Sequence, residues 1–133
     1  MGNFVLTLNG RCECGGVSFT AKNVRDAVNI CHCSQCRRSS GHLWGATRAE
    51  IEDIEFHSQD TLTWYASSDT ARRGFCNHCG SRLFFHTNGT DSKGIAAGSI
   101  EGPNGLVFGQ HIFVKDKGGY YDIPDHEHQK EAY

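Results

Sequence analysis

Hydrophobic and polar residues alternate along much of the chain, a pattern typical of half-buried strands. Near the N-terminus, Phe4, Leu6 and Leu8 fall on one face of a predicted strand over 4–9, and a second strand is predicted over 16–21. Further short segments rich in β-branched and aromatic residues are predicted as strands. They cover 43–48, 51–57, 61–66, 82–87, 95–100 and 106–115.

One segment has a helical pattern. Ser34 is a suitable N-cap, Gln35 to Ser40 supply about two turns, and Gly41 suits the left-handed end of a helix. Elsewhere, glycine-rich turns such as Asn88-Gly89 separate the strands, and no strand–helix–strand alternation is present. The sequence therefore predicts a mainly β fold of short, largely antiparallel strands with one short helix.

Length and charge narrow the classes of protein that fit. A chain of 133 residues has room for one domain, predicted over 1–124, with a polar and frayed tail over 125–133. Thirteen Lys and Arg against fifteen Asp and Glu give a net charge of −2, so nucleic acid is not an expected partner. The apolar runs fall far short of the ~20 residues that cross a bilayer, and no export signal is seen, so we expect a cytoplasmic protein without a membrane partner.

The seven cysteines carry the candidate chemistry. An odd number of thiols in a chain expected in a reducing compartment argues against a framework built of disulfides. The cysteines also fall in three tight clusters, at 12–14, 31–36 and 76–79. Clusters of this kind favour metal binding over redox-active or simply buried thiols.

The spacing suggests two metal sites of different kinds. Cys76-Asn-His-Cys79 is a Cys-x-x-Cys turn, and Cys12 with Cys14 can complete a four-thiolate structural zinc site. Three cysteines remain for a second ion, and three protein ligands leave one position for water or substrate, as in catalytic zinc sites. Other groupings, a histidine as the fourth ligand, and iron in place of zinc stay open at this point. The remaining three are Cys31, Cys33 and Cys36.

Arginines accompany the cysteines: six of the eight lie within four residues of one. They either offset the negative charge of the thiolates or bind a carboxylate of a ligand. Arg72 and Arg73 are the better candidates for ligand binding, and neighbours on a strand point to opposite faces, so at most one is expected to face a given pocket. Trp44, shortly after the three-cysteine segment, is a candidate for the wall of the pocket, with ordinary packing in the core as the more common role of such a residue.

For several histidines, roles other than metal binding are expected. His32 stands between two expected ligands, so its side chain should point away from the metal and be exposed or support the ligands. His111 lies on an apolar strand, where a hydrogen-bonded structural role and a pocket role are both open. His126 and His128 flank Glu127 in the polar tail and are expected in solvent.

The cysteine motifs resemble those of a known family. The segments 10–19, 31–37, 75–81, 111–115 and 121–124 are similar to those of the glutathione-dependent formaldehyde-activating enzyme family, which also includes centromere protein V. The resemblance implies a β-tent fold and supports the division of the cysteines into a structural zinc site of four and a second zinc site of three. Tyr120-Tyr121, where relatives often carry a tryptophan, is a departure that bears on the choice of ligand.

The resemblance also implies an activity. Such a protein would be a zinc-dependent carbon–sulfur lyase, similar to S-(hydroxymethyl)glutathione synthase, with two zinc ions and with glutathione or a glutathione adduct as its small-molecule partner. The expected substrate-binding residues are Arg72, Trp44 and His111. The alternatives are a zinc hydrolase or lyase acting on another small electrophile, and a non-catalytic binding module stabilised by zinc.

Overall fold

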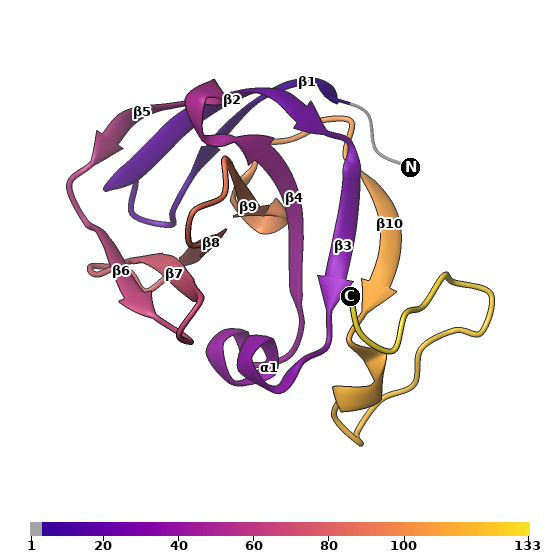
Figure 1. The fold of residues 1–133 in the computed structure, drawn as a ribbon. Helices are drawn as coiled ribbons and strands as arrows, with labels where there is room; N and C mark the ends of the chain where they lie inside the picture. The colour runs from indigo at the N-terminus through magenta and orange to yellow at the C-terminus, as the bar shows by residue number, and fades with distance from the viewer. Residues whose placement is uncertain (1–3) are drawn as a thin grey trace.

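The computed structural model describes residues 4–133, which form two β-sheets and one short α-helix, with 49% of these residues in strands. The smaller sheet has three antiparallel strands in the order β1-β2-β5. Its strands are β1 (Phe4–Arg11), β2 (Val17–Arg25) and β5 (Ile54–Gln59). In Figure 1 this sheet lies across the top of the molecule.

The larger sheet has seven strands in the order β10-β3-β4-β9-β8-β7-β6. All neighbours are antiparallel except β10 and β3, which are parallel. The helix α1 (Ser34–Ser40) joins β3 to β4 at one end of this sheet (Figure 1). The strands are β3 (Ala27–Cys31), β4 (Trp44–Glu50), β6 (Leu62–Ala66), β7 (Ala71–Cys76), β8 (Arg82–Thr87), β9 (Ser92–Ala96) and β10 (Val107–Ile112). The prediction of a mainly β, largely antiparallel fold with one helix is confirmed.

Two strands were not predicted, and both carry polar residues that interrupt the alternation. β3 contains Asn29, and β7 contains two adjacent arginines, Arg72 and Arg73. Both strands lie between two neighbours in the sheet, so their backbone groups are paired whatever the side chains do. In addition, single 3₁₀ turns form over 51–53, 97–99 and 114–116, where strand was predicted for 51–53, 97–99 and 114–115.

The predicted helix is present, but its cap differs by one residue. Cys33 rather than Ser34 is the N-cap, because its sulfur accepts a hydrogen bond from the backbone N–H of Cys36. Gly41 ends the helix with φ of 89°, in the left-handed region, as predicted. A residue expected to bind metal therefore also begins the helix.

The two faces of the larger sheet have different surroundings. One face packs against the smaller sheet around Phe19, Leu83, Phe84 and Ile95, which are at most 1% exposed. The other face carries a smaller apolar cluster that includes the three cysteines of 31–36 together with Trp44 and Phe85. The neighbours Phe84 and Phe85 on β8 fall in different clusters, so the alternation of this strand separates the main core from the cysteine side.

The C-terminal tail is not frayed, contrary to the expectation from its composition. His111 N–H donates to the carbonyl of His128 at 2.8 Å, and Lys130 N–H donates to the carbonyl of His111 at 2.9 Å. β10 is the last strand of its sheet, so its outer edge offers backbone groups that the tail pairs with. In Figure 1 the yellow segment loops out and returns to the ends of β3 and β10.

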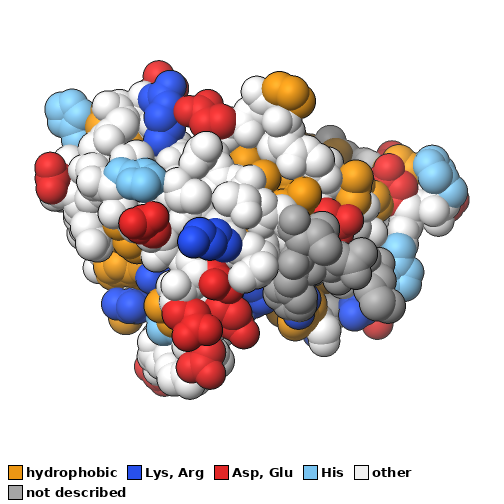
Figure 2. Space-filling model, turned by 90° about the horizontal axis from the view of Figure 1, so that it is seen from above, with side chains coloured by type: hydrophobic (Ala, Val, Ile, Leu, Met, Phe, Trp, Pro, Cys, Tyr) orange, Lys and Arg blue, Asp and Glu red, His pale blue; other side chains and the backbone are white. Residues whose placement is uncertain are grey.

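The surface carries charges of both signs. Figure 2 looks down on the molecule from above the view of Figure 1, and the described part of this face shows Lys and Arg interspersed with acidic side chains, several of which gather in one group. Across residues 4–133, the helical segments are too short and too polar to reach from one side of a bilayer to the other.

Candidate functional site

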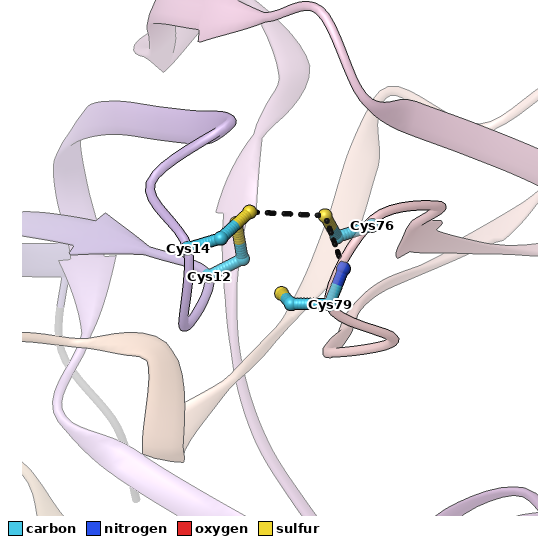
Figure 3. Close-up of side chains that lie close together, drawn as sticks. All are labelled: Cys12, Cys14, Cys76 and Cys79. Carbon is cyan, nitrogen blue, oxygen red and sulfur yellow. Dashed lines mark hydrogen bonds between the residues drawn. The ribbon is translucent and has the colours of Figure 1, made fainter.

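Four cysteines converge where the turns of two hairpins meet. Cys12 and Cys14 lie in the β1–β2 turn, while Cys76 ends β7 and Cys79 lies in the β7–β8 turn (Figure 3). The four sulfurs all lie within 4.8 Å of one another, with 3.7 Å between those of Cys12 and Cys14 and 3.6 Å between those of Cys14 and Cys76. We call these residues the quartet.

Backbone amides point at the sulfurs of the quartet. Val17 N–H donates to Cys12 Sγ at 3.3 Å, and the N–H groups of His78 and Cys79 donate to Cys76 Sγ at 3.4 and 3.3 Å. Such donors stabilise sulfur carrying negative charge, the form that binds metal. Four close thiols with amides directed at them fit a tetrahedral zinc ion.

Three further cysteines form a second group, which we call the trio. Cys31 ends β3, Cys33 caps α1, and Cys36 lies in its first turn, and their sulfurs also lie within 4.8 Å of one another. Hydrogen bonds from Cys31 and Cys36 lower the pKa of Cys33 to about 2, whereas hydrogen bonds to its neighbours and burial raise the pKa of Cys31. All three can be ionised together only beside a cation, which fits a metal held by three thiolates.

Within residues 4–133, both groups consist of cysteines alone, with no histidine nitrogen or carboxylate among the converging atoms. The structure therefore brings together the four and the three cysteines that the sequence had suggested. It does so although the two halves of the quartet lie far apart in the chain, because Cys14 and Cys76 are 62 positions apart. The trio, in contrast, comes from six consecutive residues.

The trio lies in the wall of a cavity of about 1220 Å³. The quartet does not line this cavity. Trp44 and Phe85 supply apolar lining, and Gln35 and Arg73 supply polar groups. Trp44 is 9% exposed, and its indole N–H is buried without a hydrogen-bond partner. Trp44 thus lines the cavity and also packs in the apolar cluster with the trio.

Arg73 is the arginine that faces the trio. Its side chain is buried, and Nη1 donates to Cys36 Sγ at 3.6 Å while Nη2 donates to Gln35 Oε1 at 3.1 Å. The guanidinium also lies over the ring of Phe85, 4.9 Å from its centroid. The buried Nε has no hydrogen-bond partner. Arg73 therefore places a positive charge directly against one sulfur of the trio.

The structure places Arg72 on the other face of β7, away from the cavity. Its guanidinium carbon lies 4.2 Å from the centroid of Trp64, and Nε donates to His86 Nδ1 at 3.3 Å. As expected, only one of the two adjacent arginines faces the cavity. That residue is Arg73, and not Arg72, which had been expected to bind the substrate. Successive side chains of a strand point to opposite faces of the sheet, and the sequence of β7 does not reveal which of the two faces carries the cavity.

Arg82 is a second cation on the trio side that the sequence analysis did not single out. Its guanidinium carbon lies 5.5 Å from the centroid of Trp44, and all three of its nitrogens are buried without a hydrogen-bond partner. Burial, and then the charge of Arg73, lower its pKa, while Cys36 and Cys33 oppose that shift. The signal available in the sequence was its position just after the Cys76–Cys79 turn.

The two histidines with open roles lie together behind the trio. His32 is 1% exposed, which excludes the exposed alternative, and its nitrogens contact Tyr121 Oη at 2.6 Å and His111 Nδ1 at 2.8 Å. Burial lowers the pKa of His32 to about 4. His111 binds Glu127 on its other side, at 2.8 Å, and does not line the cavity. Its observed contacts are those of a hydrogen-bonded strand residue.

With this geometry in hand, comparison with known proteins identifies the chain. Residues 7–116 match the profile of the glutathione-dependent formaldehyde-activating enzymes. The chain belongs to the glutathione-dependent formaldehyde-activating enzyme family. A protein of Schizosaccharomyces pombe described as an uncharacterized lyase is 29% identical over 115 residues, which cover 86% of this chain and 83% of that protein. The family and this relative support a lyase-type enzyme.

A solved structure shares the fold. A protein of Rhodobacter sphaeroides, known from its crystal structure, is 28% identical and superposes with a TM-score of 0.60. The match covers 72% of this chain and 90% of that chain.

Proposed function

We propose that this protein is a zinc-dependent carbon–sulfur lyase of the β-tent type that joins glutathione and formaldehyde to S-hydroxymethylglutathione, or runs the reverse reaction. Cys12, Cys14, Cys76 and Cys79 would hold a structural zinc ion, and the trio would hold a second one. The observation that carries the proposal is the placement of the trio: three converging thiols lie in the wall of a large cavity, whereas the quartet does not line it.

The trio suits a thiol substrate. Three protein ligands leave one coordination position, and a zinc ion bound there would supply a site at which a thiol loses its proton more easily. Three thiolates and a divalent ion together carry one negative charge, and the buried guanidinium groups of Arg73 and Arg82 add two positive ones. One further anion, such as a substrate thiolate, brings this local charge to zero, which favours its binding in a buried place.

The cavity suits a substrate the size of glutathione. Its volume of about 1220 Å³ exceeds the ~300–1000 Å³ usual for small-molecule sites. Arg25 and Arg48, from β2 and β4, line the cavity and are suitable partners for the carboxylates of a tripeptide. Trp44 and Phe85 would exclude water from the reacting sulfur.

The reaction itself needs little from the protein beyond position. The sulfur forms a bond to the aldehyde carbon, and the proton of the thiol ends on the aldehyde oxygen; the reverse breaks that carbon–sulfur bond. Arg73, at hydrogen-bonding distance from Cys36 Sγ, holds positive charge close to where the substrate sulfur would lie. The seven cysteines, all unbridged, fit a reducing compartment such as the cytoplasm.

Exchange spectroscopy tests this function. Formaldehyde and glutathione combine without a catalyst, so the quantity to measure is the exchange rate between free and glutathione-bound formaldehyde by NMR, with and without protein. We expect the intact protein to accelerate exchange and Cys33→Ala to abolish the acceleration. Metal analysis should find two zinc ions per intact chain and one per variant. Equal exchange rates with and without the intact, zinc-loaded protein would eliminate the proposed reaction.

A further inference from the structure

The tail beyond the family-matched residues touches the site. The match ends at residue 116, but the segment 125–133 pairs with β10, next to the strand that carries Cys31. His128 and Tyr133 from this segment line the same cavity as the trio. The tail therefore adds to the cavity a wall that lies outside the matched region.

A continuous chain of hydrogen bonds runs from the tail to His32, the residue between the first two cysteines of the trio. Glu127 Oε1 lies 2.8 Å from His111 Nε2, His111 Nδ1 lies 2.8 Å from His32 Nε2, and His32 Nδ1 lies 2.6 Å from Tyr121 Oη. His32 stands between Cys31 and Cys33 in the chain, and its backbone N–H donates to the backbone carbonyl of Ile112 at 3.0 Å. A displacement of the His32 ring would therefore move the backbone that carries two sulfurs.

The carboxylate fixes one end of this chain. Glu127 as a carboxylate only accepts, so His111 carries a proton on Nε2. With His111 neutral, its Nδ1 accepts from His32 Nε2–H. His32 Nδ1 is left to accept from the hydroxyl of Tyr121. In this arrangement every donor meets an acceptor. Both histidines are buried, so reversing the proton of either ring, with both rings neutral, would leave two donors or two acceptors face to face.

We propose that the C-terminal segment 125–133 is part of the active site and that Glu127 is a positioning residue, which acts through His111 and His32 to hold the Cys31–Cys36 turn with its three sulfurs converging. His128 and Tyr133 close one side of the cavity. This inference rests on the proposed function only where it concerns catalytic activity. The expected effects of losing Glu127 on zinc affinity and on the histidine tautomers do not depend on which substrate the protein uses.

The test compares three tail variants by their zinc affinity. Partners of a metal-ligand residue typically change metal affinity ~10–100-fold when removed. With a chromogenic chelator as competitor, we expect Glu127→Ala to weaken the more weakly held zinc ion by about tenfold or more. Glu127→Gln keeps an accepting oxygen and should restore affinity to within about threefold of the intact protein. Glu131→Ala removes an exposed carboxylate of the same tail and is the matched control.

A spectroscopic readout separates positioning from general stability. In the intact protein, long-range ¹H–¹⁵N spectra should show His32 and His111 both protonated on Nε2, and Glu127→Ala should shift His111 toward a mixture of tautomers. A His111 protonated on Nδ1 in the intact protein would overturn the proposal, and this measurement needs no variant to fold. Unchanged zinc affinity and tautomers in a folded Glu127→Ala protein would overturn it as well.

These outcomes are distinguishable from failure of the proposed function. If the intact protein does not accelerate formaldehyde exchange but Glu127→Ala still loses zinc and changes tautomer, the positioning role stands and the reaction assignment falls. If the intact protein accelerates exchange and Glu127→Ala matches it in every readout, the reaction stands and the role of the tail falls.

Discussion

The quartet and the trio use the same side chain for different purposes. The quartet joins two hairpins that are distant in the chain, since Cys14 and Cys76 are 62 positions apart. It lies between the smaller sheet and the larger one (Figure 3). The trio comes from one short turn and links nothing distant. The quartet lies away from the cavity, whereas the trio lies in its wall.

The difference shows that ligand separation along the chain indicates what a site stabilises. A cross-link between distant segments removes much freedom from the unfolded chain, so its loss affects the whole fold. A local turn removes little, so its loss should affect chiefly the cavity beside it. Burial supports this distinction, because Cys12 and Cys76 of the quartet belong to the main core and the trio belongs to the smaller cluster.

The largest expected effect on folding stability follows from removing a cysteine of the quartet. Structural zinc sites contribute about 10–16 kcal/mol of apparent binding free energy, which is comparable to the whole stability of a domain. We expect Cys79→Ser to yield largely insoluble or unfolded protein, and a strong chelator to lower the melting temperature of the intact protein sharply. Circular dichroism melts with and without chelator provide the measurement.

The same cysteine-to-serine substitution in the trio should lower the stability of the fold less and should reduce activity strongly. We expect Cys33→Ser to remain soluble, to melt within a few degrees of the intact protein, and to lose the acceleration of formaldehyde exchange. Thermal melts and the NMR exchange assay check both halves of this statement. A Cys33→Ser protein less soluble than Cys79→Ser would reverse the roles assigned to the two sites.

The two neighbouring arginines of β7 provide a sharper comparison on a smaller scale. Arg73→Met removes a charged hydrogen bond at the trio, and such bonds contribute about 1.5–3 kcal/mol, so we expect kcat/KM to fall about 10–100-fold. Arg72→Met, one residue away but over Trp64, is the control and should keep activity within about twofold. Similar losses in both variants would argue against a specific role for Arg73.

The smallest expected effect concerns Lys93, which is 8% exposed and lies over the rings of Trp64, Phe56 and Phe84 at 4.9, 5.7 and 5.7 Å from their centroids. Burial, and then the charge of Arg72, lower its pKa. The protonated form of Lys93 therefore lowers the free energy of unfolding. This destabilisation decreases as the pH rises from the lowered pKa of Lys93 in the folded protein toward 10.5, its pKa in the unfolded chain.

We thus expect Lys93→Met to raise the melting temperature at pH 7 by about 2 °C, because the lost cation–π contacts offset part of the gain. The advantage over the intact protein should diminish at alkaline pH, and activity should stay unchanged because Lys93 does not line the cavity. The same substitution at the exposed Lys22 is the control. A stabilisation independent of pH would show that packing, not charge, is responsible.

The sequence by itself determined the features that depend on near neighbours. The mainly β fold, the helix ended by Gly41 and the clustering of Cys31, Cys33 and Cys36 follow from alternation and spacing over a few residues, and these local preferences persist in the folded chain. The motifs also contained enough information to indicate the family.

Only the tertiary structure decided the features that depend on distant partners. Whether Arg72 or Arg73 faces the trio depends on which side of the larger sheet the smaller one covers. The polar tail is ordered because the outer edge of β10 offers it backbone partners. His32 is buried because His111 and Tyr121 reach it from far along the chain. Composition could not indicate these outcomes, since the groups that satisfy each polar residue come from segments that meet only after folding.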